Sequence, residues 1–254
     1  MSNDQQILSD YVLHLADNVL ILGQRNSEWC GHGPVLEQDI AITNISLDLI
    51  GQARSLYQYC AELRGNGATE DTLANLRDAR AFKNCLLVEL PKGDWAQTIT
   101  RQFFFSSYQL LLFTHLQQST DSTLAAIAEK SLKEVIYHVR WSSEWVIRLG
   151  DGTDESRERM EKAITELWPF TGELFIPASY EQASAKAGIG IDVSSLKENW
   201  LQKVQEIFSE ATLNVPANSN WSQTGGKDGV HTEHLGFVLA DLQFMQRAYP
   251  GMEW

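Results

Sequence analysis

The sequence predicts an all-α protein built on a bundle of four long helices. Apolar residues recur at three- and four-residue spacing over long stretches, as they do on one face of an α-helix. The alternation of apolar and polar residues that is typical of strands is nearly absent. Four such periodic segments lie before Gly150, which is the number that a bundle needs. The chain has 254 residues, of which 43% are hydrophobic, so its core can be substantial.

The four long helices follow one another with one unusually long connection. They are predicted at residues 4 or 5 to 24, 37–63, 94–118 and 122–149. Segment 25–34, rich in Gly and His, ends the first helix, and Gly65 ends the second. Shorter helical pieces are expected over residues 69–90, before Pro91. Because this connection is far longer than the other two, the order favours a ferritin-like bundle with a long crossover.

The remaining third of the chain is predicted to add helices to this bundle. They are expected at 155–174, 194–211 and 232–248, with a stretch punctuated by Pro and Gly up to Gly190. The prediction is one ferritin-like domain over residues 1–254, with a core bundle at about 5–150 and appended helices at about 151–254. The third long helix is apolar around its whole circumference and must be buried on every side. Either the appended helices or another subunit could cover it.

Composition excludes several classes of partner. The net charge is −13 without a basic cluster, and phosphate neutralisation needs concentrated Lys and Arg, so nucleic acids and anionic membranes are not expected partners. The three cysteines are scattered, which suggests neither a disulfide framework nor a thiolate metal site. The N-terminal residues do not resemble a signal peptide, and no run reaches the length of a membrane span. We expect a protein of the reducing cytoplasm.

A bundle of this order can hold two metal ions between its helices. That site needs a Glu on two helices and Glu-x-x-His on the other two, because positions i and i+3 share one inward face. The corresponding pair on the second helix is Leu49 and Gln52, and on the fourth it is Val135 and His138. The third helix has no Asp or Glu over residues 95–120. The sequence therefore predicts no catalytic, cofactor-binding or metal-binding residue in this chain.

Several polar residues remain near these positions. They are Asp17, Asn18, Asp48, Gln52 and His138. A charged group in a bundle core needs a partner, so we expect a hydrogen-bonded network without metal. The alternative is a weaker metal site formed by Asp17, Asp48, Glu134 and His138, in which Glu134 and His138 stand at i and i+4. Glu134 lies away from the apolar stripe, which favours a solvated side chain over a ligand.

Two further strings invite a functional interpretation and do not support it. His231-Thr-Glu-His234 lacks the i, i+4 histidine spacing of a zinc protease and a third ligand, so capping of the last helix by Thr232 or a neighbour is expected. The glycine-rich segment 225–229 lacks the spacing of a phosphate-binding loop and is predicted to be flexible. The lone basic residues Lys92, Arg101 and Lys227 are expected in solvent.

Five strings of the sequence carry a resemblance to a known family. They are EWCGHGP at 28–34, LDLIGQAR at 47–54, TLNVP at 212–216, TGGK at 224–227 and HTEHLG at 231–236. These strings resemble the family of C subunits of the bacterial phenylacetyl-CoA epoxidases, and the match spans nearly the whole chain. The resemblance implies a ferritin-like component of a multicomponent monooxygenase that inserts one oxygen atom of O2 across the 1,2 bond of the phenyl ring of phenylacetyl-CoA.

The resemblance also implies the partners and the lost site. In that family a sister protein, the catalytic di-iron subunit, holds the metal site and the CoA thioester. The C subunits support it, and a reductase that uses NADPH, FAD and an iron–sulfur centre delivers electrons. By comparison with the catalytic sister, Leu49 and Val135 replace ligand glutamates, Gln52 replaces a histidine, and His138 is kept. The third-helix position falls near Ser106. The vestigial di-iron positions predicted in this way are Asp17, Asn18, Asp48, Leu49, Gln52, Ser106, Val135 and His138.

The resulting hypothesis is a non-catalytic structural subunit without a cofactor of its own. Its expected partners are the catalytic di-iron subunit and the other epoxidase subunits, with a contact between two copies as an option within a larger hetero-oligomer. Two alternatives belong to other classes. The chain could itself be a di-iron or di-manganese oxidoreductase, or it could be a helical adaptor unrelated to aromatic catabolism.

Overall fold

The structure, a computed structural model, describes residues 3–216 and 222–252 and is helical throughout, with no strand among those residues. The predicted all-α class is therefore confirmed. The chain divides into two compact units. The first comprises Met1–Pro91, Ala178–Ser184 and Gly225–Trp254, and the second Lys92–Pro177 and Ala185–Thr224. The single domain with its core at 5–150 stays a prediction.

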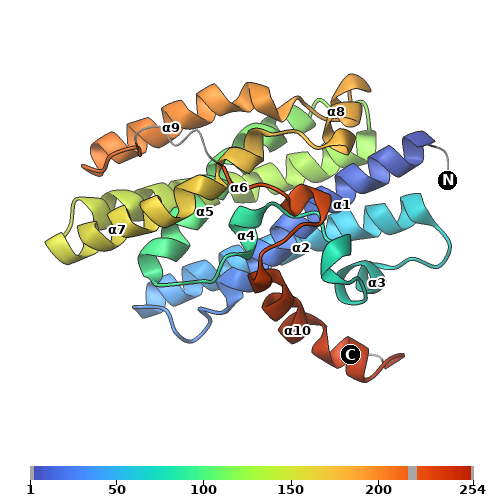
Figure 1. Ribbon diagram of the computed structural model, residues 1–254, viewed down its shortest axis with the longest axis horizontal. Coiled ribbons are helices and arrows are strands. Elements are labelled where there is room, and N and C mark those ends of the chain that lie inside the picture. The colour runs from blue at the N-terminus through green and yellow to red at the C-terminus, as the bar shows by residue number, and fades with distance from the viewer. Residues whose placement is uncertain (1–2, 217–221, 253–254) are drawn as a thin grey trace. The chain divides into compact units, whose positions relative to one another are not determined.

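The first unit is built on one long helix pair. Helices α1 (Asn3–Ser27) and α2 (Leu36–Arg64) are joined by a short loop and lie side by side (Figure 1). Gly65, with φ of 62°, ends α2 in a conformation that L side chains rarely adopt. The unit also contains short elements and the last helix. These are α3 (Glu70–Asn75), η1 (Ala79–Ala81), α4 (Leu86–Glu89), most of α8 (Ser179–Lys186), η5 (Gly226–Asp228) and α10 (Glu233–Ala248).

The second unit is built on the other long pair, α5 (Trp95–Leu116) and α6 (Ser122–Gly150). Asp94 begins α5 with a capping box to Gln97, and Asp121 accepts the backbone N–H of Leu124 at the start of α6. The remaining elements are α7 (Asp154–Leu167), η2 (Trp168–Phe170), η3 (Gly172–Phe175), η4 (Val193–Leu196) and α9 (Lys197–Glu210). The two pairs are the four helices that the sequence predicts, with ends that differ by at most three residues.

Three local predictions were wrong. The helix expected over 155–174 ends at Leu167, because Pro169 has no backbone N–H and the chain continues as two short 3₁₀ turns. The stretch up to Gly190, expected to be irregular, contains α8. The segment expected to be a flexible loop at 225–229 instead forms η5 and buries Lys227.

The apolar helix α5 is buried among helices of its own unit. Its backbone at Phe104 accepts a hydrogen bond from the indole Nε1 of Trp200 on α9, at 2.9 Å. The rings of Phe104 and Trp200 have centroids 5.6 Å apart, and Phe208 and Trp168 complete the cluster at 6.1 and 5.7 Å from Phe104. Of the two predicted covers for α5, the appended helices are the one that the structure supports. No helix in the described part of the chain has the length and hydropathy needed to cross a membrane.

This aromatic cluster predicts a large cost for truncation of Trp200. Trp200→Ala removes a fully buried ring and leaves the Phe104 carbonyl without its donor, so the free energy of unfolding should fall by about 3–5 kcal/mol. Urea denaturation followed by circular dichroism measures it. The control is Ile136→Ala on α6, where the side chain is exposed and the expected change is below about 0.5 kcal/mol. Equal effects of the two substitutions would contradict this description of the core.

Candidate functional site

Asp17 on α1 is fully buried, and its carboxylate is fully engaged by other groups of the first unit. It accepts a hydrogen bond from the Tyr57 hydroxyl at 2.6 Å and one from the backbone N–H of Lys83 at 2.8 Å. Both terminal nitrogens of Arg77 donate to it, one of them at 3.0 Å. The guanidinium also lies over the Phe82 ring, 4.1 Å from its centroid. A bidentate pair of this kind holds the carboxylate as an internal counter-ion.

This pairing changes the acid–base behaviour of its partners. Burial acts to lower the pKa of Arg77, but attraction to Asp17 outweighs it and raises that pKa. Burial and the negative charge of Asp17 raise the pKa of Tyr57 well above its ordinary value. The guanidinium is therefore a permanent cation and the phenol a permanent hydrogen-bond donor, and Asp17 serves packing of the segment after α2 against α1.

Asn18 makes the neighbouring contact to the same segment. Its Oδ1 accepts the backbone N–H of Cys85 at 2.8 Å, and its Nδ2 lies 3.3 Å from the His14 ring. On α2, Leu49 and Gln52 are buried, whereas Asp48 is only half-buried. The contacts of Asp17 and Asn18 thus run to residues 77–85, a connection that the expected network of bundle residues did not include.

In the second unit, the α5–α6 pair buries the other predicted positions. Val135 and His138 are fully buried, and Glu134 is half-buried. Ser106 Oγ on α5 lies 3.3 Å from Ser142 Oγ on α6, and Ser142 donates to the His138 carbonyl at 2.7 Å. The predicted Ser106 position is therefore linked to the turn of α6 that carries His138.

These positions do not fit a di-iron centre. Leu49 and Val135 offer only hydrocarbon where bridging carboxylates are required, and Asp17 is already neutralised by a guanidinium. Across residues 3–216 and 222–252, no group of three or more His, Cys, Asp or Glu side chains could hold a metal ion. The residues present accordingly support no chemical step through a metal.

A second buried carboxylate, Glu89, ties the start of α10 to α4. It accepts hydrogen bonds from the backbone N–H and hydroxyl of Thr232 at 2.6 and 2.8 Å, and from Asn84 at 2.8 Å. His231 Nδ1 lies 2.7 Å from Glu89, and its Nε2 lies 3.0 Å from the carbonyl of Phe82. Both partners of the ring are acceptors, so the geometry suits a doubly protonated imidazolium.

The His-Thr-Glu-His string is thus a structural clamp. Burial acts to lower the pKa of His231, but the hydrogen bond and the charge of Glu89 outweigh it and raise that pKa. The expectation that Thr232 caps α10 with its side chain was wrong, because the hydroxyl donates to Glu89. His234 takes part through its backbone: its carbonyl accepts a hydrogen bond from Arg25 at 3.2 Å.

A third buried carboxylate, Glu181 on α8, pairs with Lys227 of η5. The ammonium lies 2.9 Å from Glu181, which also accepts the backbone N–H of Ala178 at 2.8 Å and lies 3.5 Å from His14. Burial acts to raise the pKa of Glu181, but attraction to Lys227 and His14 outweighs it and lowers the pKa to about 2. The expectation of solvated basic side chains was wrong for Lys227, which is buried in this pair, and for Arg101, which is buried on α5.

Sequence reasoning missed the partners that fill this interior. One signal was present, since Glu89 is the only charged residue in the apolar run 86–90 and a buried acid needs partners. For Arg77, Glu181 and Lys227 the sequence offers no such signal, because each lies in a polar stretch. Together the three clusters hold residues 77–91, 178–184 and 225–234 around α1 within the first unit.

The fold and these interactions define a class: an all-α protein with two long helix pairs whose buried carboxylates are neutralised within the chain. The chain belongs to the phenylacetic acid catabolic protein family, whose sequence profile matches residues 1–254. It is 51% identical over 247 residues to the C subunit of the 1,2-phenylacetyl-CoA epoxidase of Escherichia coli (strain K12), covering 97% of this chain and 99% of that protein. The predicted family resemblance is confirmed.

The Asp17–Arg77 pair predicts a large destabilisation when its cation is removed. Arg77→Leu leaves a buried carboxylate without its counter-ion, so the free energy of unfolding should fall by about 3–5 kcal/mol. Chemical denaturation at neutral pH measures the change. The control is Arg159→Leu, whose ion pair with Glu155 is exposed and whose loss should leave stability nearly unchanged. A neutral Arg77→Leu substitution would refute the assigned role of this pair.

The Glu181–Lys227 pair predicts loss of stability in acid. A lowered pKa contributes stability that is present above about pH 4.5 and is lost as the pH falls toward 2. At about 1.4 kcal/mol per pH unit, the full effect is about 3 kcal/mol and about 2 kcal/mol is lost by pH 3. Unfolding free energies at about pH 6 and pH 3 measure it. Glu181→Gln should remove this part of the acid dependence, whereas the exposed Glu158→Gln should keep it; identical pH profiles for both would exclude Glu181 as its source.

Proposed function

We propose that the chain is the C subunit of a phenylacetyl-CoA epoxidase of aerobic phenylacetate degradation, and that it is a structural component without catalytic residues. The support for the first part is the 51% identity to the E. coli protein, which extends over nearly the full length of both chains. The single observation that carries the non-catalytic role is the hydrocarbon of Leu49 and Val135 at positions where a di-iron site requires carboxylates.

The proposed partner is the catalytic di-iron subunit of the same complex. In this proposal the catalytic subunit holds the metal site and the CoA thioester, and a reductase with FAD and an iron–sulfur centre supplies electrons from NADPH. The vestigial positions of this chain are Asp17, Asn18, Asp48, Leu49, Gln52, Ser106, Val135 and His138. Their role here is to fill and fix helix pairs, so that the surfaces presented to the catalytic subunit are rigid.

The physical basis of such a role is the precision that oxygen chemistry needs. A displacement of about 1 Å in reacting groups costs on the order of a hundredfold in rate. A partner whose own helices are fixed by buried ion pairs can hold the ligand-bearing helices of the catalytic subunit in place. None of the three cysteines, all of which lie among the described residues, forms a disulfide, which fits the proposed location in the reducing cytoplasm.

Reconstitution tests this proposal. The catalytic subunit purified without this chain should turn over phenylacetyl-CoA about a hundredfold more slowly, with the reductase in excess, and addition of this chain should restore the rate. The chain alone with the reductase should give no product. Full activity of the catalytic subunit by itself would defeat the structural role. Turnover by this chain alone, with about two iron or manganese ions per chain, would instead identify it as the oxidoreductase.

A further inference from the structure

Helix α10 presents a large apolar face that the rest of its unit leaves uncovered. Its inner side, with Leu235, Val238 and Leu239, is buried. The outer side carries five large apolar side chains that are between 42% and 65% exposed. They are Phe237, Phe244, Met245, Tyr249 and Met252. At about 150–250 Å² for a side chain of this kind, they expose on the order of 500 Å² of apolar surface to water.

This face is continuous along one side of the helix. At 100° per residue, Phe237, Phe244 and Ala248 fall within about 40° of one another. A patch of this size is at the upper end of the roughly 300–600 Å² that the largest patch on a monomer covers, and it supplies more than half of the about 800 Å² that each partner contributes to a standard interface. Isolated exposed apolar residues need no explanation, whereas an aligned set on one helix does.

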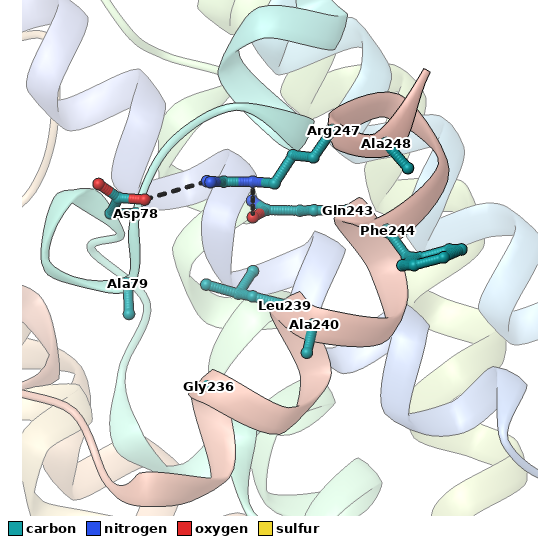
Figure 2. Close-up of a pocket in the computed structure, with 9 residues that line it drawn as sticks. All are labelled: Asp78, Ala79, Gly236, Leu239, Ala240, Gln243, Phe244, Arg247 and Ala248. Atoms are coloured by element: carbon teal, nitrogen blue, oxygen red, sulfur yellow. Dashed lines mark hydrogen bonds and ion pairs between the residues drawn. The ribbon is translucent and has the colours of Figure 1, made fainter. Parts of the chain in front are cut away.

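The helix is held rigidly from its inner side. Gln243 donates to the carbonyl groups of Ala74 and Arg77 at 3.1 and 3.0 Å, and Arg247 donates to Asp78 at 3.1 Å. Figure 2 shows this polar anchor on one side of α10, with the Phe244 ring directed away from it. Because α10 cannot roll to bury its rings against its own unit, the outer face is preorganised for a partner.

A groove of about 570 Å³ runs beside the apolar face. Its apolar lining includes Leu239, Ala240 and Phe244, and the Asp78–Arg247 ion pair borders it (Figure 2). Phe244 and Ala248 belong to both the groove and the outer face. A partner that covers the rings can therefore also insert a side chain beside the helix, which is the geometry of helix-in-groove recognition.

The charge in the middle of this face identifies the kind of partner. Asp241 lies one turn after Phe237 and one turn before Phe244, on the same side, and has no ion-pair partner among the described residues. A surface that buries both rings must cover Asp241 too, and a covered carboxylate needs a cation or strong donors. A second copy would bring a like charge and a net −13 of its own, so it fits poorly.

We propose that the outer face of α10 docks into an apolar groove of a different subunit of the epoxidase, and that a Lys or Arg of that groove pairs with Asp241. This inference rests on the proposed function, because it assumes the multisubunit complex. Phe237 and Phe244 act as the anchors, since aromatic side chains near the centre of an interface carry much of the binding free energy. Asp241 fixes the register of the helix in the groove.

Affinity capture from the co-expressed epoxidase subunits tests the docking, with a tag on this chain. Phe237→Ser/Phe244→Ser should weaken retention of the partner at least about tenfold for each ring. Asp241→Lys should weaken it at least about tenfold as well. The matched controls are Ile136→Ser/Ile176→Ser, two exposed apolar residues of the second unit, and Glu158→Lys, an exposed charge reversal on α7. Both controls should retain the partner like wild type.

The outcomes separate the two proposals. If wild type captures the other subunits and all α10 variants capture them equally, the docking face is wrong while the proposed function stands. If wild type captures none of them, the proposed function fails and the docking proposal fails with it. Dimers of this chain alone that Phe237→Ser/Phe244→Ser abolishes would assign the face to a second copy and overturn the proposal. Should the double variant lose its helical circular dichroism, the surface variant Asp241→Lys decides the question against Glu158→Lys.

Discussion

Neutralisation of buried carboxylates is the constraint on which the first unit depends. Asp17, Glu89 and Glu181 are nearly inaccessible to water, and each is held by a cation together with backbone or hydroxyl donors. Removing a partner from such a group costs far more than the pair contributes in solvent, so the three clusters lock together segments that are distant in sequence. The chain after α2, the helix α8 and the start of α10 are all fixed in this way.

This constraint bears directly on the function of the family. A di-iron site also consists of buried carboxylates, but there the compensating charge is the metal. Here Arg77 supplies that charge for Asp17, and Leu49 and Val135 need none. A protein with this interior keeps the helical architecture and gives up the metal chemistry, which suits a component whose contribution to the proposed epoxidase is its shape.

Hydrophobic periodicity predicted the long helices well, because burial of one helix face is a local, repeated signal: the ends of α1, α2, α5 and α6 lie within three residues of expectation. The loss of metal ligands at Leu49 and Val135 was equally readable, since it depends only on residue type at fixed spacing. Contacts between distant segments were not. Lys227 looked like a solvated residue of a glycine-rich loop, and only the fold brings Glu181, 46 positions earlier, against it. Thr232 was correctly placed at the start of α10, but its hydroxyl serves Glu89 and not the helix.

The central claim is that the interior of this chain is neutralised by its own side chains and holds no metal. Anomalous diffraction at the iron edge, from crystals of the complete epoxidase prepared with iron, tests it most directly because it assigns each ion to one protein of the complex. The account predicts a pair of iron peaks in the catalytic subunit and none within this chain, where the Arg77 guanidinium should stay bound to Asp17. An iron peak coordinated by Asp17, Asp48, Glu134 or His138 would contradict it.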